Sequence, residues 1–204
     1  MIIIKHRCNS VSKLKKTSIN YGIEVDLRSF GKKLIVNHNP FENGVCFEKW
    51  IGNYSHKFLI LNVKEEGLEK RLLSIMKKKK INNFFFLDQS FPFLVKTLKL
   101  KEKRCALRIS DYESAQTAFE IKLKPNWIWL DCFEKSNFNL KMLNKLKKLS
   151  YKICIVSPEL HNIKRTKEIK NLLKKINKLN FKFDAVCTKK PLMWKKYYEN
   201  ERNS

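Results

Sequence analysis

The chain has 204 residues and a formal net charge of +25, with 44 Lys or Arg against 19 Asp or Glu. This length suits one sizeable core and is short for two, so we expect a single domain over residues 1–204. The longest apolar runs, FFFL and WIWL, are as short as strands and exclude a membrane-spanning helix there. The start MIIIKHR has no signal-peptide pattern, and the six cysteines form no CxxC pair, so we expect a reduced, cytoplasmic protein.

The positive charge comes mainly from lysines in stretches that we predict to be helical, such as Lys77–Lys80 and Lys164–Lys178. A nucleic acid or an anionic membrane surface would favour such charge. The chain is also poor in Gly and rich in Lys, Asn, Ile and Phe, as a biased genome composition would produce. We therefore interpret the lysines as solvated helix faces. Peripheral contact with an anionic membrane stays open, whereas nucleic acid is not the expected partner.

Hydrophobic periodicity predicts strands that alternate with helices along the whole chain. The expected strands are Met1–Arg7, Gly22–Leu27, Phe58–Lys64, Asn83–Asp88, Arg104–Ile109, Trp127–Asp131, Tyr151–Val156 and Phe183–Thr188. The expected helices are Ser10–Ile19 (with Ser10 as N-cap), Val45–Tyr54, Gly67–Lys80, Phe91–Lys101, Glu113–Lys122, and two further helices around Leu140–Leu149 and Ile169–Ile176. Eight such units predict an α/β fold, a (β/α)₈ TIM barrel. A doubly wound open sheet is the competing fold, but no glycine-rich phosphate loop follows any strand.

One β-hairpin, inserted after the second strand, holds the most informative residues. Glu24 and Asp26 lie two apart on a strand, so both should project from its polar face. The chain then turns at Ser29–Lys32 and returns through Leu34–Val36 to His38, which should reach the height of the two acids. Two adjacent carboxylates repel unless a cation lies between them, so the pair indicates a site for a hard divalent ion.

Other polar residues fall near the carboxyl ends of expected strands, the face of a barrel that carries active sites. They are His6, Arg7, Asn62, Lys64, Asp88, Gln89, Asp131, Ser157 and Glu159. For Asp131 and Glu159 two interpretations stay open, a polar wall or a substitute third metal ligand. We assign no role to His56 or His161. We expect Trp127 and Trp129, and the cysteines at 105, 132, 154 and 187, to lie in the core.

In order along the chain, several of these fragments resemble the glycerophosphodiester phosphodiesterase family, part of the phosphatidylinositol-specific phospholipase C-like superfamily. The fragments are His6-Arg7, Glu24-Val-Asp26, His38-Asn-Pro, Asn62-Val-Lys64, Gln89-Ser-Phe, and the stretch from Asp184 to Pro191, which reads DAVCTKKP. They span residues 6 to 191. Each fragment is weak alone, and the ordered set is fairly specific.

The resemblance implies a role for each matching residue. His6 and His38 would be the general acid and base, and Arg7 and Lys64 would bind the phosphate. Glu24, Asp26 and Asn62 would hold one divalent cation, Mg²⁺ or Ca²⁺. Three positions depart from the family: Cys8 replaces a glycine, Asn39 an aspartate, and Asn62 the glutamate that completes the metal site.

We therefore expect a metal-dependent phosphoric diester hydrolase. Its small substrate would be a glycerophosphodiester or a phosphate-linked sugar or lipid head group. Two alternatives remain: a catalytically impaired barrel that binds a phosphate-containing ligand, and a basic protein that binds nucleic acid or a membrane surface. A divalent ion bound at Glu24 and Asp26 would discriminate best between them.

Overall fold

The computed structural model describes residues 1–134 and 138–202 of the chain. It divides into two compact units. We call His6–Ala106 the hairpin unit, and Met1–Lys5 together with Leu107–Ser204 the C-terminal unit. None of the helices in the described ranges is long and apolar enough to cross a lipid bilayer.

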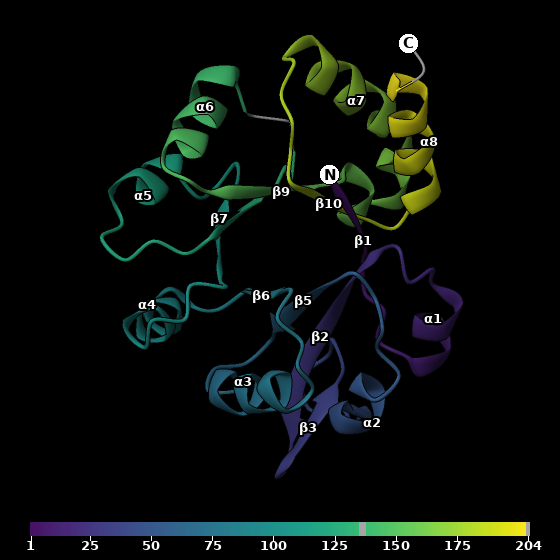
Figure 1. The fold of residues 1–204 in the computed structure, drawn as a ribbon, viewed down its shortest axis with the longest axis vertical. Helices are drawn as coiled ribbons and strands as arrows, with labels where there is room; N and C mark the ends of the chain where they lie inside the picture. The colour runs from purple at the N-terminus through teal and green to yellow at the C-terminus, as the bar shows by residue number, and fades with distance from the viewer. Residues whose placement is uncertain (135–137, 203–204) are drawn as a thin grey trace. The chain divides into compact units, whose positions relative to one another are not determined.

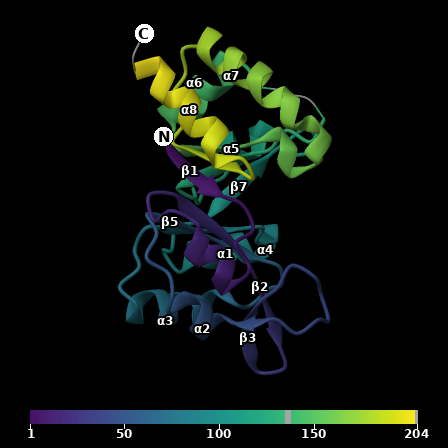
Figure 2. The same cartoon turned by 90° about the vertical axis from the view of Figure 1, so that its right-hand side faces the viewer.

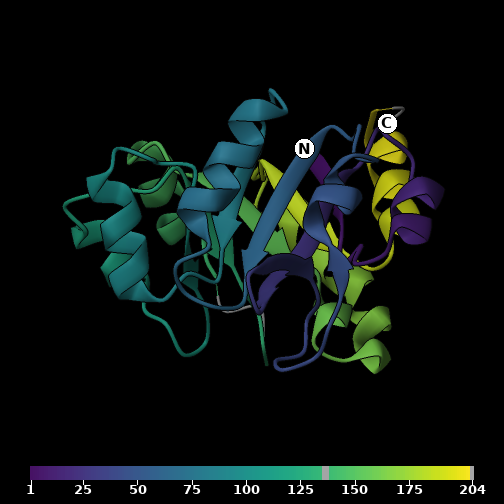
Figure 3. The same ribbon diagram turned by 90° about the horizontal axis from the view of Figure 1, so that it is seen from below.

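The hairpin unit contains five strands and four helices (Figure 1). In chain order they are α1 (Val11–Lys16), β2 (Gly22–Phe30), β3 (Lys33–Val36), β4 (Val45–Cys46), α2 (Phe47–Ile51), β5 (Phe58–Val63), α3 (Glu69–Lys78), β6 (Phe84–Leu87) and α4 (Phe91–Lys99). The strand order is β4-β3-β2-β5-β6. β3 pairs antiparallel with β2 and β4, whereas β2, β5 and β6 pair parallel. In the view from below, the blue strand β5 and the blue-teal helix α3 that follows it lie side by side (Figure 3).

The C-terminal unit contains five further strands in the order β1-β10-β9-β8-β7. Its elements are β1 (Ile2–Lys5), β7 (Ala106–Ile109), α5 (Ala115–Glu120), β8 (Trp127–Leu130), α6 (Leu140–Lys148), β9 (Lys152–Val156), the 3-10 turns η1 (Pro158–Leu160) and η2 (Ile163–Lys167), α7 (Glu168–Lys178), β10 (Ala185–Thr188) and α8 (Pro191–Arg202). The ladders of β1 with β10, β10 with β9, and β9 with β8 are parallel. Figure 2 shows α7 and α8 next to each other, and the Tyr197 hydroxyl donates to Leu173 O at 3.2 Å between them.

The predicted α/β class, the mostly parallel strands and the hairpin after the second strand are confirmed. Taken by itself, neither unit's sheet closes into a ring among its described strands. Two local predictions were wrong. The expected helix Val45–Tyr54 opens with the short strand β4, because Val45 and Cys46 pair with Val36 and Ile35. The hairpin turn is also tighter than predicted, since Phe30 already pairs with Lys33.

The parallel strands are buried on both faces, as strands covered by helices should be. Every residue from Gly22 to Leu27 is buried, so the face of β2 that carries Glu24 and Asp26 is also shielded from solvent. The predicted core positions Trp127 and Trp129 are each 4 % exposed, and the four cysteines expected in the core are buried and form no disulfide within the described ranges. The N-cap predicted at Ser10 is confirmed, because its hydroxyl accepts the Lys13 N–H at 3.1 Å.

Several helices end in the left-handed conformation without glycine. Lys80, Lys101, Ser150 and Asn180 each lie two residues after a helix and have φ between 47° and 67°. After α3, the N–H groups of Lys80 and Ile81 donate to the carbonyls of Lys77 and Met76, the pattern of a Schellman cap. A chain with only 5 glycines therefore closes these helices with residues that pay a steric cost.

Candidate functional site

Two carboxylates on β2 form the centre of the candidate site. Glu24 and Asp26 are both 0 % exposed and leave the same face of the strand. Burial, and then the negative charge of Asp26, raise the pKa of Glu24 to about 7. Buried charges are costly unless they are paired or hydrogen-bonded, so the groups around this pair determine what it can do.

The groups around Glu24 come from the predicted set. Asn62 Nδ2 donates to Glu24 Oε1 at 2.9 Å, and the Arg7 backbone N–H donates to Oε2 at 2.5 Å. His6 Nε2 lies 3.7 Å from the same Oε2. The parallel register of β2 and β5 places Asp26 opposite Asn62, which explains how an amide 38 residues away reaches the acidic pair.

Asp26 is held by three other groups. Asn9 Nδ2 donates to Asp26 Oδ2 at 2.8 Å, and Asn9 Oδ1 accepts the Asp26 N–H at 3.0 Å. Arg7 Nε lies 3.3 Å from Oδ2, and Lys64 Nζ lies 3.7 Å from Oδ1. Asn9 was missed from the sequence because it lies in a loop, where no periodicity signals a contact. The one indication in the sequence that Asn9 belongs to the site is its position three residues after His6.

The loop after β1 has a strained backbone at Arg7, whose φ is 52°. Non-glycine residues rarely adopt this region, and where they do the conformation often serves a site. Here it directs the Arg7 N–H at Glu24. The next residue, Cys8, is 0 % exposed, donates its N–H to Glu24 O at 2.8 Å and accepts the Trp50 indole N–H at 2.9 Å. Cys8 itself does not have a positive φ, so a side chain is tolerated where the family has glycine.

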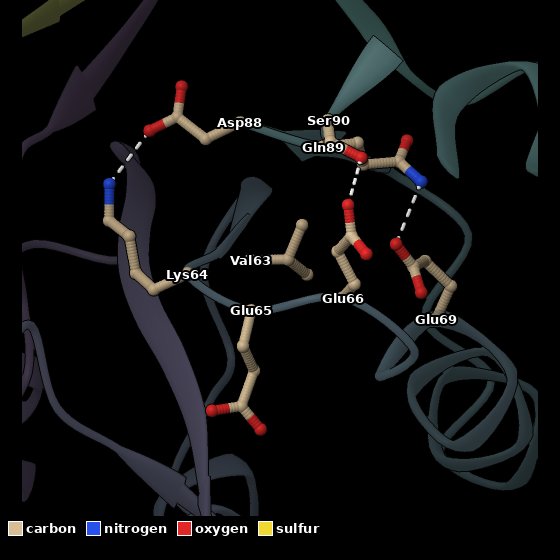
Figure 4. A pocket seen from close by; sticks show the side chains of 8 residues that line it. All are labelled: Val63, Lys64, Glu65, Glu66, Glu69, Asp88, Gln89 and Ser90. Atoms are coloured by element: carbon tan, nitrogen blue, oxygen red, sulfur yellow. Dashed lines mark hydrogen bonds and ion pairs between the residues drawn. The ribbon is translucent and has the colours of Figure 1, made fainter. Parts of the chain in front are cut away.

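Lys64 leads from the acidic pair into a pocket (Figure 4). Its ammonium donates to Asp88 Oδ2 at 2.7 Å, and Asp88 also has a positive φ of 61°. The cavity has a volume of about 300 Å³ and is lined by Val63, Lys64, Glu65, Glu66, Glu69, Asp88, Gln89 and Ser90. Figure 4 shows Glu66 directed at Ser90 and Glu69 at Gln89, while Glu65 points away from them. The pocket therefore presents Lys64 together with several carboxylates.

His38 has a weaker connection to this group. It lies two residues after the end of β3 and is only partly buried. In the described part of the chain, its ring hydrogen-bonds only with Asn39 Oδ1, at 3.2 Å, while its carbonyl accepts from Arg28 Nε at 3.0 Å. The ring makes no hydrogen bond or ion pair with Glu24 or Asp26. His6, by contrast, lies against Glu24.

The oxygen donors of the acidic pair suit a hard cation such as Mg²⁺ or Ca²⁺. Two buried oxygens, Asp26 Oδ1 and Asn62 Oδ1, accept no hydrogen bond from any residue that the structure describes, as expected of atoms kept for a ligand. The described residues nevertheless hold no group of three or more His, Cys, Asp or Glu side chains placed to bind a metal ion. Two carboxylates and one amide are therefore the protein ligands that this site can offer.

The C-terminal unit contains the two acids whose role the sequence left open. Asp131 and Glu159 are 4 % and 0 % exposed, and both oxygens of each carboxylate are engaged by protein donors. Both acids therefore belong to the internal hydrogen-bonding network of the C-terminal unit.

Comparison with known proteins adds evidence on the fold. The sequence matches no protein-family model and no curated protein. Among solved structures, a protein from Agrobacterium tumefaciens assigned as a glycerophosphoryl diester phosphodiesterase has a TM-score of 0.73 at 11% identity, covering 100% of this chain and 99% of its own. A glycerophosphodiester phosphodiesterase from the same organism has a TM-score of 0.61 at 11% identity, with 94% and 97% covered. A glycerophosphoryl diester phosphodiesterase from Parabacteroides distasonis has a TM-score of 0.66 at 12% identity, with 98% and 86% covered.

The chain has the glycerophosphodiester phosphodiesterase fold. The resemblance read from the short sequence fragments is thus confirmed at the level of the fold, and the neighbours are TIM barrels of the predicted architecture. At 11–12% identity the likeness does not extend to individual residues. The roles of His6, Arg7, Glu24 and Asp26 within this fold therefore stay predictions.

Proposed function

We propose that this chain is a metal-dependent phosphoric diester hydrolase. Its substrate would be a glycerophosphodiester or a phosphate-linked sugar or lipid head group. The observation that carries the proposal is the buried Glu24–Asp26 pair beside Arg7 and Lys64. Within the described chain, Asp26 Oδ1 and Asn62 Oδ1 accept no hydrogen bond. A cation bound beside basic side chains can stabilise the negative charge that builds on the phosphoryl oxygens during diester hydrolysis. The fold shared with glycerophosphodiester phosphodiesterases supports the same reaction class.

Glu24, Asp26 and Asn62 would hold the divalent cation. When bound, such an ion offsets negative charge on the phosphoryl oxygens. The raised pKa of Glu24 supports this role, because a carboxylate that resists ionisation alone gains most from a cation beside it. The amide of Asn62 contributes an oxygen without a charge, so the ion would be bound more weakly than by three carboxylates.

His6, His38, Arg7 and Lys64 would act on the substrate. The guanidinium of Arg7 and the ammonium of Lys64 would bind the non-bridging oxygens, and Asp26 and Asp88 would orient these two cations beforehand. His6, 12 % exposed and placed against Glu24, would transfer a proton on one side of the phosphorus. His38 would transfer the second proton, and it would have to come closer to the substrate than its present contact with Asn39 requires.

Hydrolysis of a diester panel by the full chain tests the proposal. The panel would include bis(p-nitrophenyl) phosphate, glycerophosphodiesters and sugar phosphodiesters, assayed with EDTA and with excess Mg²⁺ or Ca²⁺. We expect turnover that EDTA abolishes and that Asp26→Ala removes. Glu48→Ala is the matched control, because Glu48 is an exposed carboxylate paired with Arg71. Turnover that is unchanged by EDTA and by Asp26→Ala would contradict the proposal.

A catalytically impaired phosphate-binding protein is the second candidate, and two observations favour it. The side chain at position 62 beside Glu24 is a neutral amide, and the ring of His38 contacts the amide of Asn39 instead of an acid. This reading predicts that phosphate compounds bind while no diester is turned over. A basic nucleic-acid or membrane-surface protein would instead show affinity that falls steeply with salt and is indifferent to Glu24→Ala.

A further inference from the structure

A second cluster of polar side chains lies in the C-terminal unit, where β8 ends. The side chain of Asp131 is 3 % exposed and accepts the Trp129 indole N–H at 3.1 Å and the Cys132 N–H at 3.0 Å. It also binds an arginine and a histidine: Arg108 Nη1 lies 2.8 Å from Oδ2, and His161 Nε2 lies 2.5 Å from Oδ1. Asp131 thus orients a histidine and an arginine at the same time.

The backbone that carries His161 is fixed by another buried acid. Glu159 Oε1 accepts the Thr188 hydroxyl at 2.5 Å and the Lys189 N–H at 2.9 Å, and Oε2 accepts the Ser157 hydroxyl. These bonds tie the turn η1 to the end of β10, and His161 follows that turn directly. A fully satisfied buried network of this kind rigidifies its surroundings. His161 is therefore fixed twice: its backbone by the turn that Glu159 holds, and its imidazole by the hydrogen bond with Asp131.

The exposed side of the cluster is shaped by Phe133. The His161 ring packs on Phe133 with centroids 4.5 Å apart, and the Arg108 guanidinium lies 5.7 Å from the centroid of the same ring. The Arg165 guanidinium donates to the carbonyls of Cys132, Phe133 and Glu134, so this loop is anchored. The side chains of His161 and Arg108 are 21 % and 26 % exposed. Both therefore reach solvent next to one aromatic ring.

We propose that His161 and Arg108, oriented by Asp131, form a binding site for a phosphate group. Nε2 of His161 is hydrogen-bonded to Asp131, and no described residue hydrogen-bonds Nδ1, so Nδ1 can meet a ligand. A phosphate near neutral pH has both a hydroxyl and charged oxygens, so it can hydrogen-bond Nδ1 whether that atom donates or accepts. Arg108 supplies a permanent positive charge; it pairs with Asp131, and its Nε lies 3.8 Å from Glu113. The proposal does not depend on diesterase activity.

Nitrogen-15 NMR of the full chain labelled at histidine tests this site. Inorganic phosphate and phenyl phosphate would be titrated separately. Both titrations should shift the Nδ1 resonance of His161 to saturation, while the resonances of His56, whose Nε2 lies 3.0 Å from Thr17 O, stay in place. Tighter binding of phenyl phosphate would indicate an ester with an apolar group on Phe133, and equal binding would indicate recognition of the phosphate alone. Unmoved His161 resonances with both probes would overturn the proposal.

Variants assign the binding to these residues. His161→Gln and Arg108→Gln should each raise the phosphate dissociation constant by about tenfold or more, since each removes a charge-assisted hydrogen bond. His56→Gln and Arg104→Gln are the matched controls and should leave it unchanged, because His56 contacts Thr17 O and Arg104 pairs with Glu102. Asp131→Asn should weaken binding and alter the nitrogen-15 pattern of the His161 ring tautomers. Unchanged phosphate affinity in both His161→Gln and Arg108→Gln, with thermal melts showing both folded, would refute the site.

Discussion

Replacing Glu24 with Gln should remove a pH dependence from the stability of the metal-free protein. Burial, and then the charge of Asp26, raise the pKa of Glu24 from its usual 4.5 to about 7. The folded chain therefore holds this proton more tightly than the unfolded chain. The resulting stability is fully present below pH 4.5 and is lost as the pH rises through about 7.

The size of the effect follows from the same interval. A rise in pKa from 4.5 to about 7 corresponds to about 3 kcal/mol in the free energy of unfolding. Glutamine has one accepting oxygen and one NH2 group, so Glu24→Gln can accept from the Arg7 N–H only if the Asn62 amide turns its oxygen toward the new NH2 group. The comparison therefore rests on how stability changes with pH and not on its absolute value. The free energy of unfolding of the wild type should fall by about 3 kcal/mol as the pH rises through this range, and that of Glu24→Gln should not.

Urea denaturation of both proteins in EDTA, from pH 4.5 to about 8, measures the difference. His56 titrates in the same window with the opposite sign, because burial lowers its pKa and its contribution is lost as the pH falls. The difference between wild type and Glu24→Gln cancels that contribution. Excess Mg²⁺ or Ca²⁺ should restore wild-type stability at the upper end of the range. Curves for the two proteins that stay parallel across the range would refute the reasoning.

Three further changes test other parts of the structure. Asn62→Asp should tighten Mg²⁺ or Ca²⁺ binding in calorimetric titrations, because it adds a negative charge beside the acidic pair. Unchanged affinity would mean that position 62 does not contact the ion. His38→Ala should lower diester turnover by about a hundredfold or more and flatten one limb of the pH–rate profile, while metal affinity is retained. Turnover by His38→Ala at the wild-type rate would exclude His38 as the acid or base. Trp50→Phe should lower the free energy of unfolding in urea by about 1–3 kcal/mol, because it removes the indole N–H that donates to the buried Cys8 carbonyl at 2.9 Å. An unchanged free energy of unfolding would contradict the stabilising role of this hydrogen bond.

Local sequence determined much of this protein. Alternating apolar segments predicted the strands and helices, because the periods 2 and 3.6 follow from backbone geometry alone. The proximity of Glu24 to Asp26 was also predictable, since residues two apart on a strand share a face. The short turn after β2 could join only antiparallel strands, which made the hairpin predictable as well.

Tertiary structure decided the environment of each functional group. The sequence pattern could not reveal that the polar face of β2 is buried, because burial depends on the strands and helices that pack against it. It also left His161 without a role, since its partner Asp131 lies 30 residues away and the two meet only where β8 and β9 run parallel. Asn9 and Asp88 acquire their partners in the same way, through loops that no periodicity describes. Local pattern specifies which element a residue belongs to, whereas charge, burial and hydrogen bonding depend on contacts between residues far apart in the chain.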